Sequence, residues 1–185
     1  IFMFSITSVK KIFDLYNFDL IDVLPQTTHG GSMRYIIARK KEYAIKQSVT
    51  NGLLTESKNN LDKLDSCLTF KENCEISKKK ITNRLRKFKS EGKKICGYAA
   101  TSKSTTILNY CNINNDIIDF ICDTTKEKIG KFSPGTHIPI VPMSHFHQNP
   151  SDIAYLFAWN HREEIFAKEK EFIKNGGKWT SHVSL

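Results

Sequence analysis

The sequence predicts an α/β protein: a Rossmann-like C-terminal domain with a parallel sheet, preceded by a helix and a β-hairpin. In the second half of the chain, short apolar runs alternate with segments of helical period, which is the pattern of βαβ crossovers. The 185 residues suffice for one good core, or for one domain with part of another. An apolar fraction of 39% with twelve Phe indicates a folded chain.

The first forty residues predict a helix followed by a hairpin. "SITSVKKIFDLYN" places apolar residues on one helical face behind a possible N-cap at Ser5 or Thr7. "FDLIDVLP" alternates and ends at Pro25, and "SMRYIIARK" is rich in β-forming residues, so we expect two antiparallel strands. These elements cannot bury their own faces, and we expect them to be the end of a larger sheet.

A polar connection and a basic helix follow the hairpin. Residues 42–69 predict one or two helices, with the breaker "TNG" at 50–52. Between Lys71 and Lys94 there are ten Lys or Arg and three Glu, within a chain of net charge +9. We interpret this run as one amphipathic helix that ends at Gly92 and has a solvated basic face. Binding of nucleic acid is disfavoured because exposed aromatic platforms are missing. The expected buried stripe consists of Phe70, Cys74, Ser77, Ile81, Leu85 and Phe88.

The remainder of the chain predicts the parallel sheet. Short strands are expected at "KKICGYA", "DIIDFICD" and "DIAYLFAW", an extended segment at "HIPIVP", and a last strand at "KWTSHVSL". Helices are expected at "SKSTTILNYC" and at "HREEIFAKEKEFIKNGG", which its glycines close.

Cysteine and histidine usage predicts neither a disulfide framework nor a metal site. The five Cys, an odd number, form no C-x-x-C pair, so reduced thiols and a cytoplasmic location are the simplest interpretation. His145 and His147 could pair on a metal, but no third ligand stands in register. No apolar run approaches the length of a membrane span, so no membrane partner is expected.

The stretch "GYAATSKS", from Gly97 to Ser104, joins an expected strand to an expected helix. Such a turn lies at the carboxyl end of a parallel strand, where free N–H groups and the helix dipole favour an anion. It nearly matches the P-loop pattern, but Ser102 stands in place of the second Gly. Either this is a looser diphosphate cradle centred on Lys103, or it is an ordinary turn with an exposed lysine. Asp123 ends the next strand, where an acid often meets a ribose hydroxyl.

Four stretches together resemble one family: "FDLIDVLPQTTHGGSMRYIIARK", "ICGYAATSKSTTILNYC", "GKFSPGTHIPI" and "LFAWNHREEI". They are similar to the C-terminal part of S-adenosylmethionine-dependent C-methyltransferases that act on nucleotide-linked deoxy-ketosugars. The resemblance runs from residue 1 nearly to the end and is weakest between 42 and 90. Ala99 departs from it, because it replaces the second Gly of the family's Gly-Tyr-Gly-Ala-x-x-Lys pattern.

The resemblance implies a domain organisation. Residues 1–41 would be the C-terminal remnant of a class I methyltransferase domain that binds S-adenosylmethionine, 42–92 a helical connection, and 93–185 a Rossmann-like domain that binds the sugar nucleotide. The methyl-donor site, the catalytic Tyr-His-Glu-His motif and a zinc-binding domain are expected upstream of Ile1. Neither S-adenosylmethionine nor zinc is therefore expected to bind this chain.

The resemblance also implies a substrate and the residues that hold it. The partner would be a nucleoside-diphosphate sugar, methylated next to a C4 ketone after proton abstraction, and His29 is the one possible catalytic residue. In this interpretation "HGGSMR" faces the cleft between the domains, and His29, Ser32 and Arg34 contact the sugar or the phosphates. A glycine hairpin with Arg34 on the sheet surface is the competing interpretation. We expect positive φ at Gly30 or Gly31. Other functions that remain open are a stand-alone nucleotide- or sugar-nucleotide-binding module and a phosphotransferase with a degenerate P-loop. The expected substrate-binding residues are His29, Gly30, Gly31, Ser32, Arg34, Gly97, Tyr98, Ser102, Lys103, Ser104, Thr105, Asp123 and His137.

Overall fold

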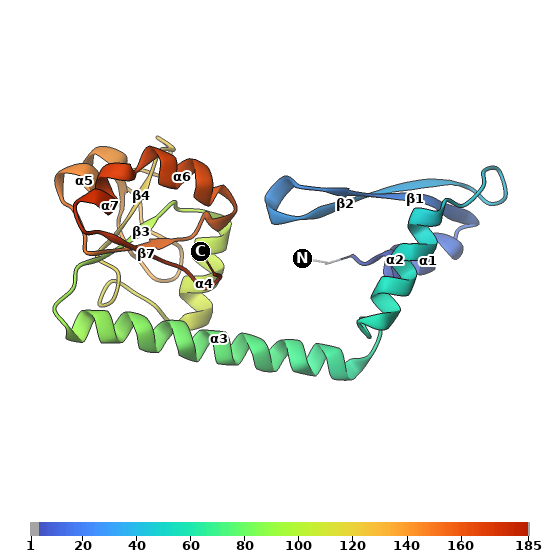
Figure 1. Ribbon diagram of the computed structural model, residues 1–185, viewed down its shortest axis with the longest axis horizontal. Helices are drawn as coiled ribbons and strands as arrows, with labels where there is room; N and C mark the ends of the chain where they lie inside the picture. Colours follow the sequence, from blue (N-terminus) through green and yellow to red (C-terminus); the bar gives the residue numbers. More distant parts are fainter. Residues whose placement is uncertain (1–3, 185) are drawn as a thin grey trace. The chain divides into compact units, whose positions relative to one another are not determined.

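The computed structural model describes residues 4–184, and of His29 it describes the backbone but not the side chain. The chain forms two compact units, Ile1–Asn73 and Cys74–Leu185. Helix α3 (Leu64–Ser90) contributes residues to both units (Figure 1). In the described part of the chain, no helix combines the length and the apolar character that spanning a bilayer requires.

The N-terminal unit contains the predicted helix and hairpin. Helix α1 (Ile6–Asp14) begins behind Ser5, which forms a capping box with Ser8. Strands β1 (Phe18–Gln26) and β2 (Ser32–Arg39) pair antiparallel, as predicted. Their inner face packs on α1 and on α2 (Gln47–Lys58) around a small core of Ile6, Val9, Leu20, Val23 and Val49.

The expected break at 50–52 is wrong, because α2 continues through it. A Cβ on Gly52 would collide with the Cδ1 atom of Ile6, so this glycine allows α1 to pack closely on α2. The Glu56 carboxylate on the same helix accepts the backbone N–H groups of Ile6 and Thr7 at 2.6 and 2.8 Å. The glycine therefore serves the contact between two helices and does not end one.

The hairpin turn contains a short 3-10 segment, Thr28–Gly30. Gly30 and Gly31 have φ of 87° and 126°, which confirms the expectation of positive φ at this turn. Side chains with a Cβ rarely adopt this backbone, so the glycine pair is required by the turn itself.

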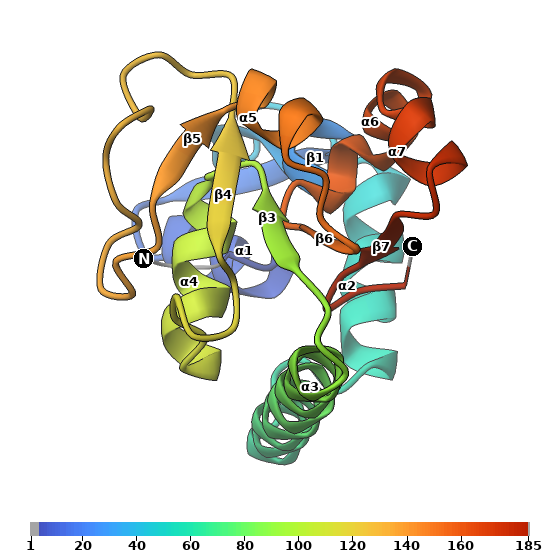
Figure 2. The same cartoon turned by 90° about the vertical axis from the view of Figure 1, so that its left-hand side faces the viewer.

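The second unit is built on a five-stranded parallel sheet, which confirms the predicted Rossmann-like α/β class. Its order is β5-β4-β3-β6-β7, and every neighbouring pair is parallel. Figure 2 shows α4 (Ser102–Cys111) running back beside β3 and β4. The strands are β3 (Ile95–Tyr98), β4 (Phe120–Asp123), β5 (Ile140–Pro142), β6 (Ile153–Leu156) and β7 (Lys178–Thr180).

Helices cover both faces of this sheet. On one face α3 and α4 pack on a cluster that includes Ile81, Leu85, Leu108, Ile121 and Phe157. On the other face α5 (Met143–Gln148), α6 (Arg162–Lys168) and α7 (Lys170–Lys174) close a second cluster, which includes Tyr98, Phe120, Phe146, Ile165 and Phe172. Alternate residues of each strand face opposite clusters, as the period of a strand requires.

Three expectations for this unit need correction. The basic helix begins at Leu64. Phe70, which was expected to be buried, is 71% exposed, because α3 contributes residues to the apolar core only from Ile81 onward. The segment 116–123 is a strand only from Phe120, since Asn114 and Asp116 form a side-chain-bonded turn before it. The helix expected over 161–177 is interrupted at Glu169.

Candidate functional site

The turn after β3 lies where the order of strands reverses. From β3 the chain builds the sheet outward through β4 and β5, and it then returns to place β6 and β7 on the other side of β3. In doubly wound sheets, ligands bind at the carboxyl ends of the strands beside such a switch point. A ligand-binding site is therefore expected at the carboxyl ends of β3 and β6.

Helix α4 begins at this edge with a well-defined cap. Thr101 is the N-cap, and its hydroxyl accepts the backbone N–H of Ser104 at 3.2 Å. The Ser104 hydroxyl donates to the Thr101 carbonyl at 2.6 Å and is buried, so it is used within the cap. In the part of the chain that the structure describes, the backbone N–H groups of Ser102 and Lys103 have no acceptor. These two donors remain available to an anion at the positive end of the helix dipole.

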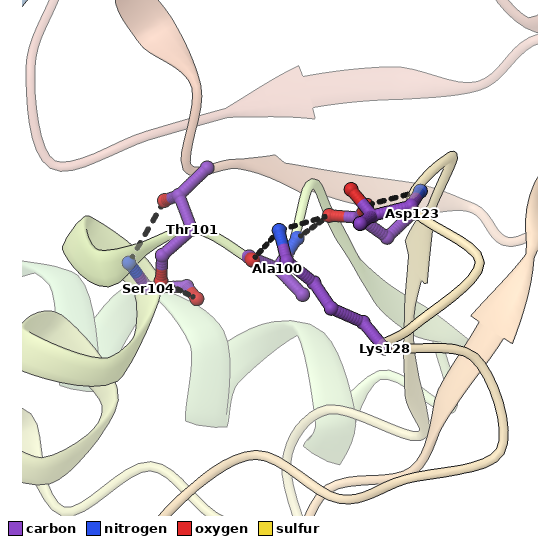
Figure 3. Close-up of polar contacts among 6 residues, drawn as sticks. Ala100, Thr101, Ser104, Asp123 and Lys128 are labelled. Carbon is purple, nitrogen blue, oxygen red and sulfur yellow. Dashed lines mark hydrogen bonds and ion pairs between the residues drawn. The ribbon is translucent and has the colours of Figure 1, made fainter.

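Asp123, at the end of β4, holds the same turn from the other side. Its carboxylate accepts the backbone N–H groups of Ala100 and Thr125, both at 2.7 Å (Figure 3). The Lys128 ammonium lies 3.5 Å from this carboxylate and donates to the Ala100 carbonyl at 2.8 Å. Burial favours the protonated acid, but the hydrogen bonds from Thr125 and Ala100 and the charge of Lys128 outweigh it and lower the pKa of Asp123. With 6% of the residue exposed, Asp123 acts here as a support of the turn.

Lys103 extends from the first turn of α4 to the segment that follows β6. Its ammonium donates to the Asn160 side-chain carbonyl at 3.0 Å and lies 5.7 Å from the centre of the Trp159 ring. Sequence reasoning missed Trp159 and Asn160 as partners of Lys103. Their position directly after an apolar strand was the available signal, because the carboxyl ends of parallel strands meet at one edge.

Two other predicted residues of β3 lie beneath the turn. Gly97 is buried, and a Cβ there would lie 2.7 Å from Phe157 Cε2 and 2.9 Å from Ile121 Cγ1, so packing alone requires glycine. The Tyr98 hydroxyl donates to Glu169 at 2.8 Å on the opposite face of the sheet from α4. Burial, and then the hydrogen bond to Glu169, raise the pKa of this phenol. The described contacts of these two residues are packing and a buried hydrogen bond within the sheet.

Thr105 and His137 occupy different positions relative to Lys103. Thr105 is half-buried in the first turn of α4, where its N–H donates to the Thr101 carbonyl at 3.3 Å. His137 is exposed, has a φ of 52°, and lies in a loop whose Pro134 carbonyl accepts a hydrogen bond from Asn109. Among the described contacts, none joins His137 to the turn after β3.

The hairpin residues belong to the N-terminal unit. Ser32 and Arg34 are exposed and alternate along β2 with Met33 and Tyr35, which pack on the small core. Ser32 and Arg34 therefore lie on the opposite face of the strand. The His29 side chain, the possible catalytic group, lies outside the described part of the structure.

The described residues contain the following groups that bear on a ligand or a metal ion. They contain no group of three His, Cys, Asp or Glu that could hold a metal ion. The N-terminal unit supplies an antiparallel hairpin and helices, not the parallel strand and glycine-rich turn that bind an adenosyl cofactor. What the site offers is two free backbone N–H groups, one ammonium and an indole ring at the switch point.

Sequence comparison relates the chain to one family and to one curated methyltransferase. Residues 27–183 match a protein family described as the C-methyltransferase C-terminal domain. Over 177 residues the chain is 30% identical to the C-methyltransferase NovU of Streptomyces niveus. The match covers 95% of this chain and 42% of that protein, so the chain spans less than half the length of its curated relative. With a parallel α/β sheet and a family match over most of its length, the chain belongs to the C-methyltransferase C-terminal domain family.

Proposed function

We propose that this chain is the C-terminal portion of an S-adenosylmethionine-dependent C-methyltransferase and that it holds a nucleoside-diphosphate-linked deoxy-ketosugar. Family membership and the sequence relationship to a C-methyltransferase support the activity. The resemblance of the quoted motifs to enzymes acting on deoxy-ketosugars supports the substrate. The chain would bind and orient the sugar nucleotide, and the diphosphate would be its main point of attachment.

One observation carries the proposed attachment: Ser102 and Lys103 have free backbone N–H groups in the first turn of the helix that also carries the Lys103 ammonium. A diphosphate offers several oxygens to such donors, and the helix dipole adds to the attraction. The Trp159 ring, already beside the Lys103 ammonium, is available to pack on the nucleoside or the sugar.

The rest of the parent enzyme would supply the methyl donor site and the zinc-binding domain. Bound S-adenosylmethionine supplies the methyl group, and the carbon that accepts it must first lose a proton beside the C4 ketone. The residues of this chain would fix the sugar so that this carbon is presented to the donor. His29, Gly30, Gly31, Ser32 and Arg34 would contact the sugar or the phosphates from the hairpin. In the intact enzyme, His29→Ala and Arg34→Ala should then reduce turnover and leave folding nearly unchanged.

Calorimetric titration of the chain with thymidine diphosphate and uridine diphosphate tests the attachment. Lys103→Ala should weaken binding by roughly 1.5–3 kcal/mol, the contribution of a hydrogen bond to a charged group. The matched control is Lys174→Ala, which removes a lysine whose side chain is 74% exposed on α7 and should leave affinity unchanged. Unchanged affinity in Lys103→Ala, together with an affinity that does not depend on salt concentration, would show that the turn binds no diphosphate.

The same titration with S-adenosylmethionine tests whether the methyl-donor site lies outside this chain. We expect no useful affinity, because the described N-terminal unit forms a hairpin and helices rather than a βαβ unit with a glycine-rich donor loop. Micromolar binding by this chain would contradict the assignment of the donor site to the rest of the parent enzyme.

A further inference from the structure

A polar cavity lies in the C-terminal unit, between α3 and the segment around and after β7. Its volume is about 290 Å³. Helix α3 contributes Ser77, Lys80 and Arg84, and the other wall includes Thr180, Ser181 and His182. Among the described residues, no Asp or Glu lines it. Its described lining therefore carries two positive charges and several hydroxyl groups without a carboxylate to balance them.

The two cations stand on one face of α3, four residues apart. Like charges at this spacing destabilise a helix unless an anion lies between them. In the described part of the chain, neither Lys80 nor Arg84 has a carboxylate within ion-pair distance. Among the described residues, the Arg84 guanidinium donates one hydrogen bond, to the Thr180 hydroxyl at 3.3 Å. A guanidinium has five N–H donors, so most of its capacity is left for a ligand.

The wall after β7 is held rigidly against the sheet. Thr180 and Ser181 are buried, and the Ser181 hydroxyl donates to the Leu156 carbonyl at 3.0 Å. His182 stacks on Tyr155, whose hydroxyl lies 3.2 Å from Nδ1 of the ring. Burial and the charge of Lys103 lower the pKa of His182, so the ring is neutral near pH 7. Either group can donate in this contact, and the tautomer whose Nδ1 accepts has an N–H donor on Nε2.

We propose that this cavity is a second anion site, which binds a phosphate group between Lys80 and Arg84. A tetrahedral dianion matches the paired ammonium and guanidinium and can also accept from the hydroxyl groups of the walls. The small volume suits inorganic phosphate or the phosphate of a small phosphoester. The site is distinct from the first turn of α4, since Ser102 and Lys103 do not line it.

Calorimetric titration of the full chain with inorganic phosphate and with uridine monophosphate, at low ionic strength, tests the site. The double substitution K80Q/R84Q should weaken phosphate binding at least tenfold. The matched control is K79Q/R86Q, which removes the same two kinds of charge from exposed positions on the same helix outside the cavity and should change affinity less than twofold. Arg84→Lys, which keeps the charge, should retain most of the affinity. Since Lys80 and Arg84 are exposed, K80Q/R84Q should also keep the thermal midpoint of the unsubstituted chain.

The outcomes separate this site from the proposed diphosphate site. Phosphate binding that survives Lys103→Ala and fails in K80Q/R84Q supports the second site, even if diphosphate binding at α4 is absent. Equal losses in K80Q/R84Q and K79Q/R86Q would show unspecific attraction to the basic helix and overturn the proposal, as would phosphate binding that depends on Lys103 alone. Within the supporting result, tighter binding of the monophosphate than of phosphate identifies a phosphoester as the occupant, and equal or weaker binding identifies free phosphate.

Discussion

The Asp123 carboxylate and the backbone N–H of Ala100 are 2.7 Å apart, although 23 residues separate them in the sequence. This contact ties the end of β4 to the turn that leads from β3 into α4. Lys128 closes the arrangement by donating to the Ala100 carbonyl. The position of the free N–H groups at Ser102 and Lys103 therefore depends on a buried acid in the neighbouring strand.

Replacement of that acid should loosen the turn. Asp123→Asn removes the charge that accepts two backbone N–H groups, so the free energy of unfolding should fall by about 1.5–3 kcal/mol, the contribution of hydrogen bonds to a charged group. Urea unfolding at pH 7 measures this change. Asp116→Asn, at an exposed position of the same unit, is the control and should stay within about 0.5 kcal/mol.

The same variant should change how stability responds to acid. The folded-state pKa of Asp123 lies below its ordinary value of 3.8, so its contribution to stability is fully present above pH 3.8 and is lost as the pH falls through the lower folded value. The difference in stability between the natural chain and Asp123→Asn should shrink over that acidic range. A difference that stays constant from pH 6 to pH 2 would mean that the Asp123 charge does not stabilise the turn.

Replacement of Ala99 by glycine should stabilise the fold. Its φ of 73° lies in the left-handed region, and its N–H donates to the Cys122 carbonyl, which fixes this backbone. Ala99→Gly should raise the free energy of unfolding by about 0.5–1 kcal/mol, because relief of the strain exceeds the entropy that glycine gains in the unfolded chain. Thermal and urea unfolding test it, with Ala100→Gly as a control that should lower stability. Glycine at this position would also restore the pattern of the similar family.

Gly97 should tolerate no side chain. Ala at this position would press on Phe157 and Ile121 beneath β3, and overpacking of this kind costs about 1–3 kcal/mol. A double-mutant cycle with Phe157→Leu measures the clash, since the smaller side chain should recover part of the loss. If the two substitutions were simply additive, contact with Phe157 would not be the cause.

Much of this fold follows from periodicity and turn chemistry. The hairpin, the segment of α4 and the parallel sheet were each predictable, because apolar period and cap residues act locally. The glycine pair at 30 and 31 likewise predicted a turn with positive φ. In the candidate site, the Lys103 turn was predictable because a strand followed by a capped helix fixes where the free N–H groups point.

The remainder depends on contacts that a linear pattern does not contain. Glu169 falls within a helical period, yet its side chain is buried and accepts hydrogen bonds from Tyr98 and from His147, and the helix is interrupted there. Asn160 meets Lys103 only because β6 lies next to β3 in the sheet. The contacts of Tyr98 with Glu169 and of Lys103 with Asn160 join residues 71 and 57 positions apart, and neither leaves a local signature.

Helix α3 offers a last test, which separates the cost of burying a polar group from the benefit of packing. Thr82 is 8% exposed, and its hydroxyl has no hydrogen-bond partner among the described residues. A buried hydroxyl without a partner costs about 1–3 kcal/mol, whereas Thr and Val have similar shapes and similar helix propensities. Thr82→Val should therefore raise the free energy of unfolding by about 1 kcal/mol, measured by urea unfolding.

The control for Thr82 is Thr106→Val on α4. The Thr106 hydroxyl is exposed and donates to the Ser102 carbonyl at 3.2 Å, so its removal relieves no burial and should not stabilise the chain. A gain in both variants would reflect a general preference for Val in these helices. A gain in Thr82→Val alone locates the cost at the unpartnered hydroxyl, and a loss there would show that the hydroxyl is satisfied in solution, by a water molecule at the edge of α3.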